Sequence, residues 1–109
     1  MLELWQTEWC PSSRRVRQRL TELGIDYLTR QVPVDRTDRR ALHEATGVDT
    51  IPALLLESGK PVIGEESILA FLDGSIAEPP GADAHRTKAA NARRRYLEEE
   101  CECSPPATR

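Results

Sequence analysis

The order in which apolar patterns follow one another constrains the fold of this chain more than any other feature of its sequence. Residues 2–6 alternate between apolar and polar side chains, a period of two that indicates a short β-strand. After Pro11, apolar residues recur every three or four positions as far as Gly24, which is the spacing of one helix face. Proline suits the first position of a helix and glycine the position just past its end. Residues 25–34 are rich in β-branched and aromatic residues and predict a second strand.

A second helix and an apolar strand follow. We expect this helix to begin at Asp35 or Thr37 and to end before Gly47. Its apolar side holds Ala41, Leu42 and Ala45. Residues 53–56 form an unbroken apolar run, which is typical of a central strand that is covered on both faces.

A hairpin and a third helix complete the pattern. Residues 58–60, Ser-Gly-Lys, indicate a turn, and residues 61–63 predict a short edge strand, where proline is tolerated. Gly64 separates this strand from a third helix over residues 65–72, which Gly74 ends. The order is therefore strand, helix, strand, helix, two strands, helix. With right-handed crossovers, this order predicts an α/β protein with a mixed four-stranded sheet.

Composition argues against several classes of protein. The chain has 109 residues, which suits one domain, and its net charge of −3 argues against non-specific nucleic-acid binding. No apolar run approaches the roughly 18 residues of a membrane helix, and the first residues do not have the pattern of a secretory signal. The three cysteines, at positions 10, 101 and 103, are not spaced like a disulfide framework. We therefore expect a protein of the reducing cytoplasm, without membrane or nucleic-acid partners.

Two parts of unequal size are predicted. Residues 1–78 hold the pattern described above, and residues 79–109 hold a proline-rich linker, a helix from about 82 to 102 and a frayed tail. Acidic residues follow the arginines in this last helix, so negative charges lie at its C-terminal end, where the helix dipole is also negative. We therefore expect that the helix must dock against another element to be stable. Cys101 and Cys103 lack further ligands or partners, and we interpret them as inert rather than as a metal site or a resolving pair.

The candidate reactive group is Cys10, which directly precedes the predicted first helix. Free N–H groups and the positive end of the helix dipole favour thiolate over thiol, and cysteines so placed titrate at about 3.5 to 7.5 instead of about 8.5. Ser13 lies three residues on, where its hydroxyl can donate a hydrogen bond to the sulfur. Arg14 and Arg15 add positive potential, and the arginines of this helix together are interpreted as a solvated face. A buried structural cysteine is the alternative, which the following proline disfavours.

Two further segments have a physical reason to lie at a ligand site. An X-Pro bond prefers trans by only about 0.5–1 kcal/mol, so tertiary contacts can hold Ile51-Pro52 cis and present the Ile51 backbone to an extended, peptide-like thiol. An ordinary proline at a strand entry is the alternative. Ser67 and its neighbours open the third helix, so their N–H groups can bind a carboxylate, and Glu66 can bind an ammonium group. The alternative is that Glu66 and Ser67 are only helix caps.

Three short motifs resemble those of a known family. Residues 9–13, Trp-Cys-Pro-Ser-Ser, resemble the Cys-Pro-x-Cys/Ser motif of glutaredoxins and of the thioredoxin-like half of glutathione transferases, and the Trp-Cys step is similar to that of mycoredoxins. Residues 50–52, Thr-Ile-Pro, resemble the segment of these families whose cis proline faces the cysteine. Residues 64–68 resemble the transferase segment that holds the γ-glutamyl end of glutathione. The resemblance covers about residues 2–74 and implies a thioredoxin fold.

The resemblance also implies a function. We expect a monothiol thiol–disulfide oxidoreductase that acts on mixed disulfides with glutathione or another low-molecular-weight thiol, and that holds no tight cofactor and no metal. Thiolated proteins would be its substrates. Cys10 would be the nucleophile, and Ser13 would donate a hydrogen bond to its thiolate. The thiol-binding residues would be Trp9, Pro11, Ile51, Pro52, Glu66 and Ser67.

Other functions stay open on the sequence alone. A non-catalytic binding or adaptor module would keep the fold and lose turnover. Iron–sulfur cluster carriage by a dimer would use one Cys10 from each chain, although the usual monothiol pattern of Gly-Phe-Ser after the cysteine is replaced here by residues 11–13, Pro-Ser-Ser. The residues after Gly74 are too few for the complete helical domain of a full transferase, which argues against conjugation chemistry. The oligomeric state is left open.

Overall fold

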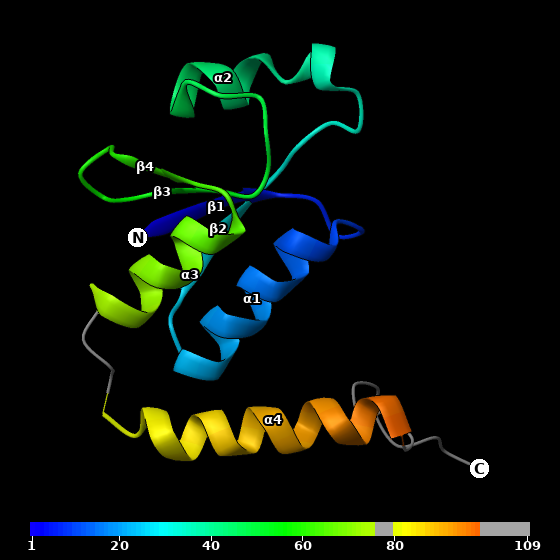
Figure 1. Ribbon diagram of the computed structural model, residues 1–109, viewed down its shortest axis with the longest axis vertical. Coiled ribbons are helices and arrows are strands. Elements are labelled where there is room, and N and C mark those ends of the chain that lie inside the picture. The colour runs from blue at the N-terminus through cyan, green and yellow to red at the C-terminus, as the bar shows by residue number, and fades with distance from the viewer. Residues whose placement is uncertain (76–79, 99–109) are drawn as a thin grey trace, which may run out of the picture.

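The computed structural model describes residues 1–75 and 80–98, and its centre is one four-stranded sheet (Figure 1). The strands are β1 (Leu2–Gln6), β2 (Tyr27–Gln31), β3 (Ala53–Leu55) and β4 (Pro61–Ile63). Their order across the sheet is β2-β1-β3-β4. Strand β1 pairs parallel to β2 and antiparallel to β3, and β3 pairs antiparallel to β4. The sheet is therefore mixed, as the sequence predicts.

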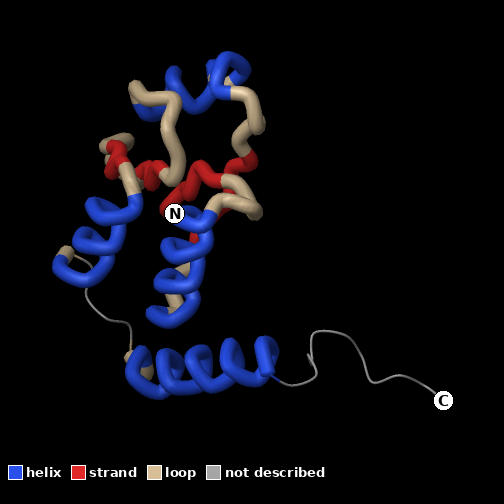
Figure 2. Tube along the Cα trace, turned by 45° about the vertical axis from the view of Figure 1, so that its right-hand side comes forward, coloured by secondary structure: helices blue, strands red, loops and turns tan. Residues whose placement is uncertain are grey.

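The helices form layers on the sheet, and both views agree on their placement (Figures 1 and 2). Helices α1 (Pro11–Leu23) and α3 (Glu65–Gly74) cover one face. A short 3-10 turn, η1 (Arg36–Asp38), and helix α2 (Arg40–Thr46) lie on the other. Helix α4 (Ala82–Glu98) crosses α1 on the side away from the sheet. The predicted thioredoxin fold with a helical extension is confirmed.

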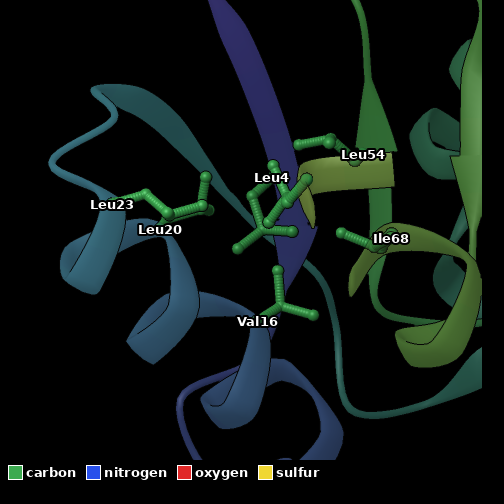
Figure 3. Close-up of a cluster of buried hydrophobic side chains, with 7 residues drawn as sticks. Leu4, Val16, Leu20, Leu23, Leu54 and Ile68 are labelled. Atoms are coloured by element: carbon green, nitrogen blue, oxygen red, sulfur yellow. The ribbon is translucent and has the colours of Figure 1, made fainter. Parts of the chain in front are cut away.

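Two apolar clusters, one on each face of the sheet, hold these layers together. The larger one lies between the sheet and helices α1 and α3 (Figure 3). Its buried members are Leu4, Val16, Leu20, Leu23, Leu54, Ile68 and Leu72. The smaller cluster joins Val32, Leu42 and Ala53 on the α2 side. Strand β3 contributes Leu54 to one cluster and Ala53 to the other, which explains its unbroken apolar sequence.

Strand β2 is shorter than the predicted span of 25–34. It pairs residue for residue with β1, from Leu2 with Tyr27 to Gln6 with Gln31, so the five residues of β1 limit its length. The N–H of Val32 still donates to the carbonyl of Gln6 at 3.1 Å. The next residue is a proline, which has no N–H to continue the ladder.

The second helix also begins later than predicted. The carboxylate of Asp35 accepts the N–H of Thr37 at 3.1 Å, and this bond caps the short turn η1 rather than an α-helix. Helix α2 begins only at Arg40, without a side-chain cap, and ends at Gly47 as predicted. The physical reason is that an aspartate side chain bonds its own neighbouring backbone, which favours a local turn as readily as a long helix.

Helix α4 docks against α1, as its unfavourable charge order requires. Arg93 Nη1 donates to Glu22 Oε1 at 3.0 Å, and Ala82 is buried. The His85 ring lies over Gly24, where an added Cβ would be 3.3 Å from Nδ1. The boundary predicted between residues 78 and 79, the predicted helix end near 102 and the tail with its two cysteines lie outside the described residues. Within the described parts, no helix is long and apolar enough to cross a membrane.

Candidate functional site

Cys10 is the N-cap residue of α1. Its backbone is extended (φ −74°, ψ 121°), Pro11 occupies the first helical position, and the carbonyl of Cys10 accepts the first helical hydrogen bond, from the N–H of Arg14, at 3.0 Å. The N–H of Ser13 donates to Cys10 Sγ at 3.5 Å. The sulfur therefore occupies the position where a serine or aspartate oxygen usually caps a helix. The side chain is half-buried and its thiol is free.

The surroundings of Cys10 lower its pKa. Burial acts the other way and raises the pKa, but the hydroxyl and the N–H of Ser13, the N–H of Ser12 and the charge of Arg15 together outweigh it. The hydroxyl oxygen of Ser13 is buried and has no hydrogen-bond partner of ordinary geometry among the described residues, so its hydrogen is free to turn toward the sulfur. The structure thus adds the Ser13 N–H to the hydroxyl donor that we predicted.

An ion pair joins the N-termini of α1 and α3. Arg15 donates to both carboxylate oxygens of Glu65, from Nε at 2.5 Å and from Nη2 at 2.8 Å. The same Nη2 lies 3.5 Å from Ser12 Oγ. Arg15 holds the pKa of the Glu65 carboxyl below its usual value, and this two-point contact fixes the start of α3 beside the start of α1. No role was predicted for Glu65, because no local signal in the sequence connects residues 50 positions apart.

The Ile51–Pro52 peptide bond is cis, and Pro52 is buried. The carbonyl of Pro52 accepts the N–H of Gly64 at 3.0 Å, which attaches this corner to the residue before α3. Neither the N–H nor the C=O of Ile51 makes a hydrogen bond to any described residue. Two backbone groups are thus open at the corner.

The start of α3 is open as well. Gly64 is the N-cap residue, with φ 88°, and no side chain caps the helix. Glu66 and Ser67 are both exposed. The alternative that these two residues serve only as caps is therefore wrong, and the first N–H groups of α3 have no side-chain partner.

The predicted residues fall into two groups, one at the cis-proline corner and the start of α3, the other beside the loop before α1. The Arg15–Glu65 pair and the Gly64–Pro52 bond bring the corner and the start of α3 to the end of the fold that carries Cys10. A separate hollow of about 430 Å³ lies beside the loop before α1. It is lined by Glu8, Trp9, Pro11, Arg14, Arg15 and Gln18, and Trp9 is 61% exposed at its rim.

The arginine face predicted to be solvated on α1 is exposed at Arg14 and Arg15, whereas Arg17 and Arg19 are partly buried. Besides Arg15, Arg19 pairs with Asp73 through Nη2 at 2.6 Å. Arg17 donates to the backbone carbonyls of Thr7 at 3.1 Å and Glu8 at 3.3 Å, and to the side chain of Gln6. Arg17 thereby fixes the loop that leads from β1 to the cysteine. Only the folded chain brings these partners together, so the helical spacing alone did not indicate them.

A local metal centre has no support in the part of the chain that the structure describes. No group of three or more histidine, cysteine, aspartate or glutamate side chains there is arranged to hold a metal ion. A cluster shared between two chains would need only one Cys10 from each, so this observation does not bear on it.

Solved structures similar to this chain include several glutathione transferases. A rice glutathione S-transferase, solved in complex with glutathione, is 25% identical, with a TM-score of 0.60 over 89% of this chain and 47% of its own. A glutathione transferase family member from Pseudomonas fluorescens, with bound glutathione, is 22% identical, with a TM-score of 0.63 over 90% of this chain and 52% of its own. This chain therefore spans about half the length of these proteins.

A glutaredoxin has the same fold. Glutaredoxin 2 from Salmonella typhimurium, in complex with glutathione, is 16% identical, with a TM-score of 0.63 over 72% of this chain and 35% of its own. No curated protein matches the sequence. Residues 4–80 match the sequence model of the glutathione S-transferase N-terminal domain. The match spans more than half of the chain, so this protein belongs to the family of glutathione S-transferase N-terminal domains.

Proposed function

We propose that this protein is a monothiol thiol–disulfide oxidoreductase that acts through Cys10 on mixed disulfides with glutathione or a similar small thiol. The observation that carries the proposal is the position of Cys10 Sγ as a helix N-cap, where it accepts the Ser13 N–H and has a lowered pKa. Thiolate is the nucleophilic form, and a thiol whose pKa is near the ambient pH combines a large thiolate fraction with good nucleophilicity.

The proposed cycle has two exchange steps. The Cys10 thiolate attacks the glutathione sulfur of a mixed disulfide, the substrate thiolate leaves and takes a proton, and Cys10 becomes glutathionylated. A second glutathione thiolate then attacks the glutathione sulfur on Cys10, which releases oxidised glutathione and regenerates the Cys10 thiolate. In the net reaction the substrate sulfur is reduced to a thiol and one free glutathione is oxidised, joining the glutathione of the mixed disulfide as oxidised glutathione, so atoms and electrons balance. Ser13 cannot attack the intermediate as a cysteine would, so the second step needs the external thiol.

The open groups around the cysteine support binding of a peptide-like thiol. The free N–H and C=O of Ile51 can pair with the backbone of the thiol as an added strand does. The uncapped start of α3, with Ser67, suits a carboxylate, and exposed Glu66 suits an ammonium group. Glutathione carries both groups at its γ-glutamyl end. The glutathione in the similar transferase and glutaredoxin structures supports this assignment.

The remaining roles follow from position. Pro52 would hold the Ile51 backbone in place, and Trp9 and Pro11 would flank the sulfur at the neighbouring hollow. That hollow would receive the substrate half of the mixed disulfide. The cytoplasm suits this cycle, because a pool of reduced small thiol is required to regenerate Cys10.

The experiment is reduction of a mixed disulfide between glutathione and a small thiol, with glutathione as the reductant. Wild type and a Cys101→Ser/Cys103→Ser double variant are expected to turn over at the same rate, whereas Cys10→Ser is expected to be inactive. Equal rates for wild type and Cys10→Ser would remove the proposal. Glutathione binding that survives in Cys10→Ser, with no turnover in wild type, would identify a binding module instead. A visible absorption band after anaerobic reconstitution with iron and sulfide would identify a cluster carrier.

A further inference from the structure

Arg39 is a buried cation whose hydrogen bonds all go to backbone carbonyls. Its side chain sits at the start of α2, and the residue is only 7% exposed. Nε donates to the carbonyl of Pro33 at 2.9 Å, Nη2 to that of Val34 at 3.1 Å, and Nη1 to that of Asp49 at 2.9 Å. A guanidinium is planar and carries five donors in a fixed fork, so it can hold three carbonyls in one arrangement.

The three carbonyls belong to two loop segments that both reach the candidate site. Residues 33–34 follow Val32, whose N–H donates to the carbonyl of Gln6. Gln6 is the last residue of β1, and the loop that leads to the cysteine begins after it. Asp49 lies two residues before Ile51. Arg39 therefore joins the segment that leaves the β1–β2 end of the sheet to the segment that enters the cis-proline corner (Figure 1).

The side chains of the corner pack, with Ile51 against the smaller apolar cluster and Pro52 buried, but its backbone makes few other hydrogen bonds. On its far side, the Pro52 carbonyl is held by the N–H of Gly64. On its near side, neither Thr50 nor Ile51 makes a hydrogen bond to any described residue. The bond from Arg39 to the carbonyl of Asp49 is thus the last backbone attachment before the two open groups of Ile51.

Asp49 provides a comparison within the same loop. Its side chain pairs with Arg36 at 2.8 Å, but both side chains are largely exposed, 62% for Arg36 and 47% for Asp49. Such exposed pairs contribute little to the geometry of a loop. Arg39, in contrast, holds the backbone of Asp49 from a buried position, where a charge-assisted hydrogen bond is strong and costly to lose.

We propose that Arg39 is a positioning residue that fixes the Ile51 backbone for the small thiol, an inference that rests on the function proposed above. Among the described residues, the Arg39 side chain makes no hydrogen bond to Cys10 or to Ser12 and Ser13, which are the residues that bond the sulfur. Its loss should therefore weaken recognition of the thiol and leave the chemistry of the sulfur unchanged. A residue of general structural importance would instead change both.

The test compares Arg39→Lys with Arg36→Gln in the full chain. Lysine retains the charge and the long stem, but its three donors share one nitrogen, which cannot replace the three separate nitrogens that bond these carbonyls. For Arg39→Lys we expect the KM for the glutathione mixed disulfide to rise about tenfold, the loss that corresponds to one charge-assisted hydrogen bond, with kcat unchanged. The rate at which iodoacetamide alkylates Cys10 should also stay unchanged. Arg36→Gln should behave as wild type in all three measurements.

Amide hydrogen exchange supplies a readout that does not depend on turnover. The Gly64 amide, which donates to the Pro52 carbonyl at the corner, should exchange faster in Arg39→Lys than in wild type and Arg36→Gln, while amides of α1 exchange alike in all three proteins. If Arg39→Lys does not fold, Arg39→Gln, which also retains a donor, takes its place in both assays.

Three results would overturn the inference. They are an unchanged KM in Arg39→Lys, a parallel fall of kcat and alkylation rate, and unchanged exchange of the Gly64 amide. Wild-type protein that reduces no mixed disulfide would instead overturn the proposed function, and exchange of the Gly64 amide would still decide whether Arg39 holds the corner.

Discussion

Two glycines at helix C-termini allow the docking of α4 to be measured. Gly24 ends α1 with φ 68°, and Gly47 ends α2 with φ 82°. Replacement by alanine costs about 1–2 kcal/mol for the left-handed backbone, and the reduced freedom of the unfolded chain returns about 0.4–1 kcal/mol. The expected net loss is about 1 kcal/mol at either position. At Gly47 nothing lies within 4 Å of an added Cβ, so this loss should be the whole effect.

Gly24→Ala should cost more than Gly47→Ala because of His85. The new Cβ would lie 3.3 Å from His85 Nδ1, closer than an ordinary contact of about 3.5–4.0 Å. The ring must shift, and α4 is held on α1 by the Arg93–Glu22 pair. We expect an additional loss of about 1 kcal/mol, the low end of overpacking penalties, because the ring is exposed.

The assay is urea unfolding of the two alanine variants, each in the wild-type and the His85→Ala background. The additional cost at Gly24 should disappear in His85→Ala, while the cost at Gly47 stays the same. The rate of Cys10 alkylation should not change, because a 13-residue helix places Gly24 about 20 Å from the cysteine. Equal costs at both glycines, or an additional cost that persists without His85, would refute this account of α4 docking.

Two further predictions concern the thiolate. Ser13→Ala removes the hydroxyl beside the sulfur and should raise the pKa of Cys10. The alkylation rate should then begin to rise at a higher pH than in wild type. An unchanged pH profile would show that the backbone N–H groups are enough to lower the pKa without the hydroxyl. Arg15→Gln should shift the same profile to higher pH, because it removes a nearby positive charge and leaves the Glu65 carboxylate unpaired. Arg14→Gln is the matched control on the preceding residue, and a shift of equal size there would point to overall charge rather than to Arg15.

Both thiolate predictions have a definite sign. A lowered pKa means that the folded environment favours the charged form of the thiol, so the thiolate persists to lower pH than in free cysteine. Each substitution removes a contribution that lowers the pKa. The thiolate fraction at a given pH below the new value therefore falls, and alkylation slows.

Local sequence determined much of this protein. The alternation of residues 2–6, the spacing along α1 and the glycines after α1 and α2 each act within a few residues, and the structure follows them. The position of Cys10 as an N-cap is also local, because the residue before Pro11 at a strand–helix junction has little choice but to face the first free N–H groups. The candidate nucleophile could therefore be predicted from the sequence.

Two predicted element ends were wrong, one because of a local hydrogen bond and the other because of strand pairing. The aspartate at position 35 caps a 3-10 turn where a helix was expected, since its carboxylate bonds the nearest N–H in either case. Strand β2 ends early because its length depends on its partner β1, not on its own β-forming residues.

Tertiary structure alone decided which charged groups meet. Arg15 finds Glu65, Arg19 finds Asp73 and Arg39 finds three carbonyls, and none of these pairings has a signal in the spacing of the sequence. Periodicity reports which side of an element faces the core, whereas the reach of a long charged side chain depends on which elements lie next to it. Local sequence thus determined that Cys10 caps a helix, whereas the packing of α1, α2 and α3 determined which charged side chains and backbone carbonyls pair with one another.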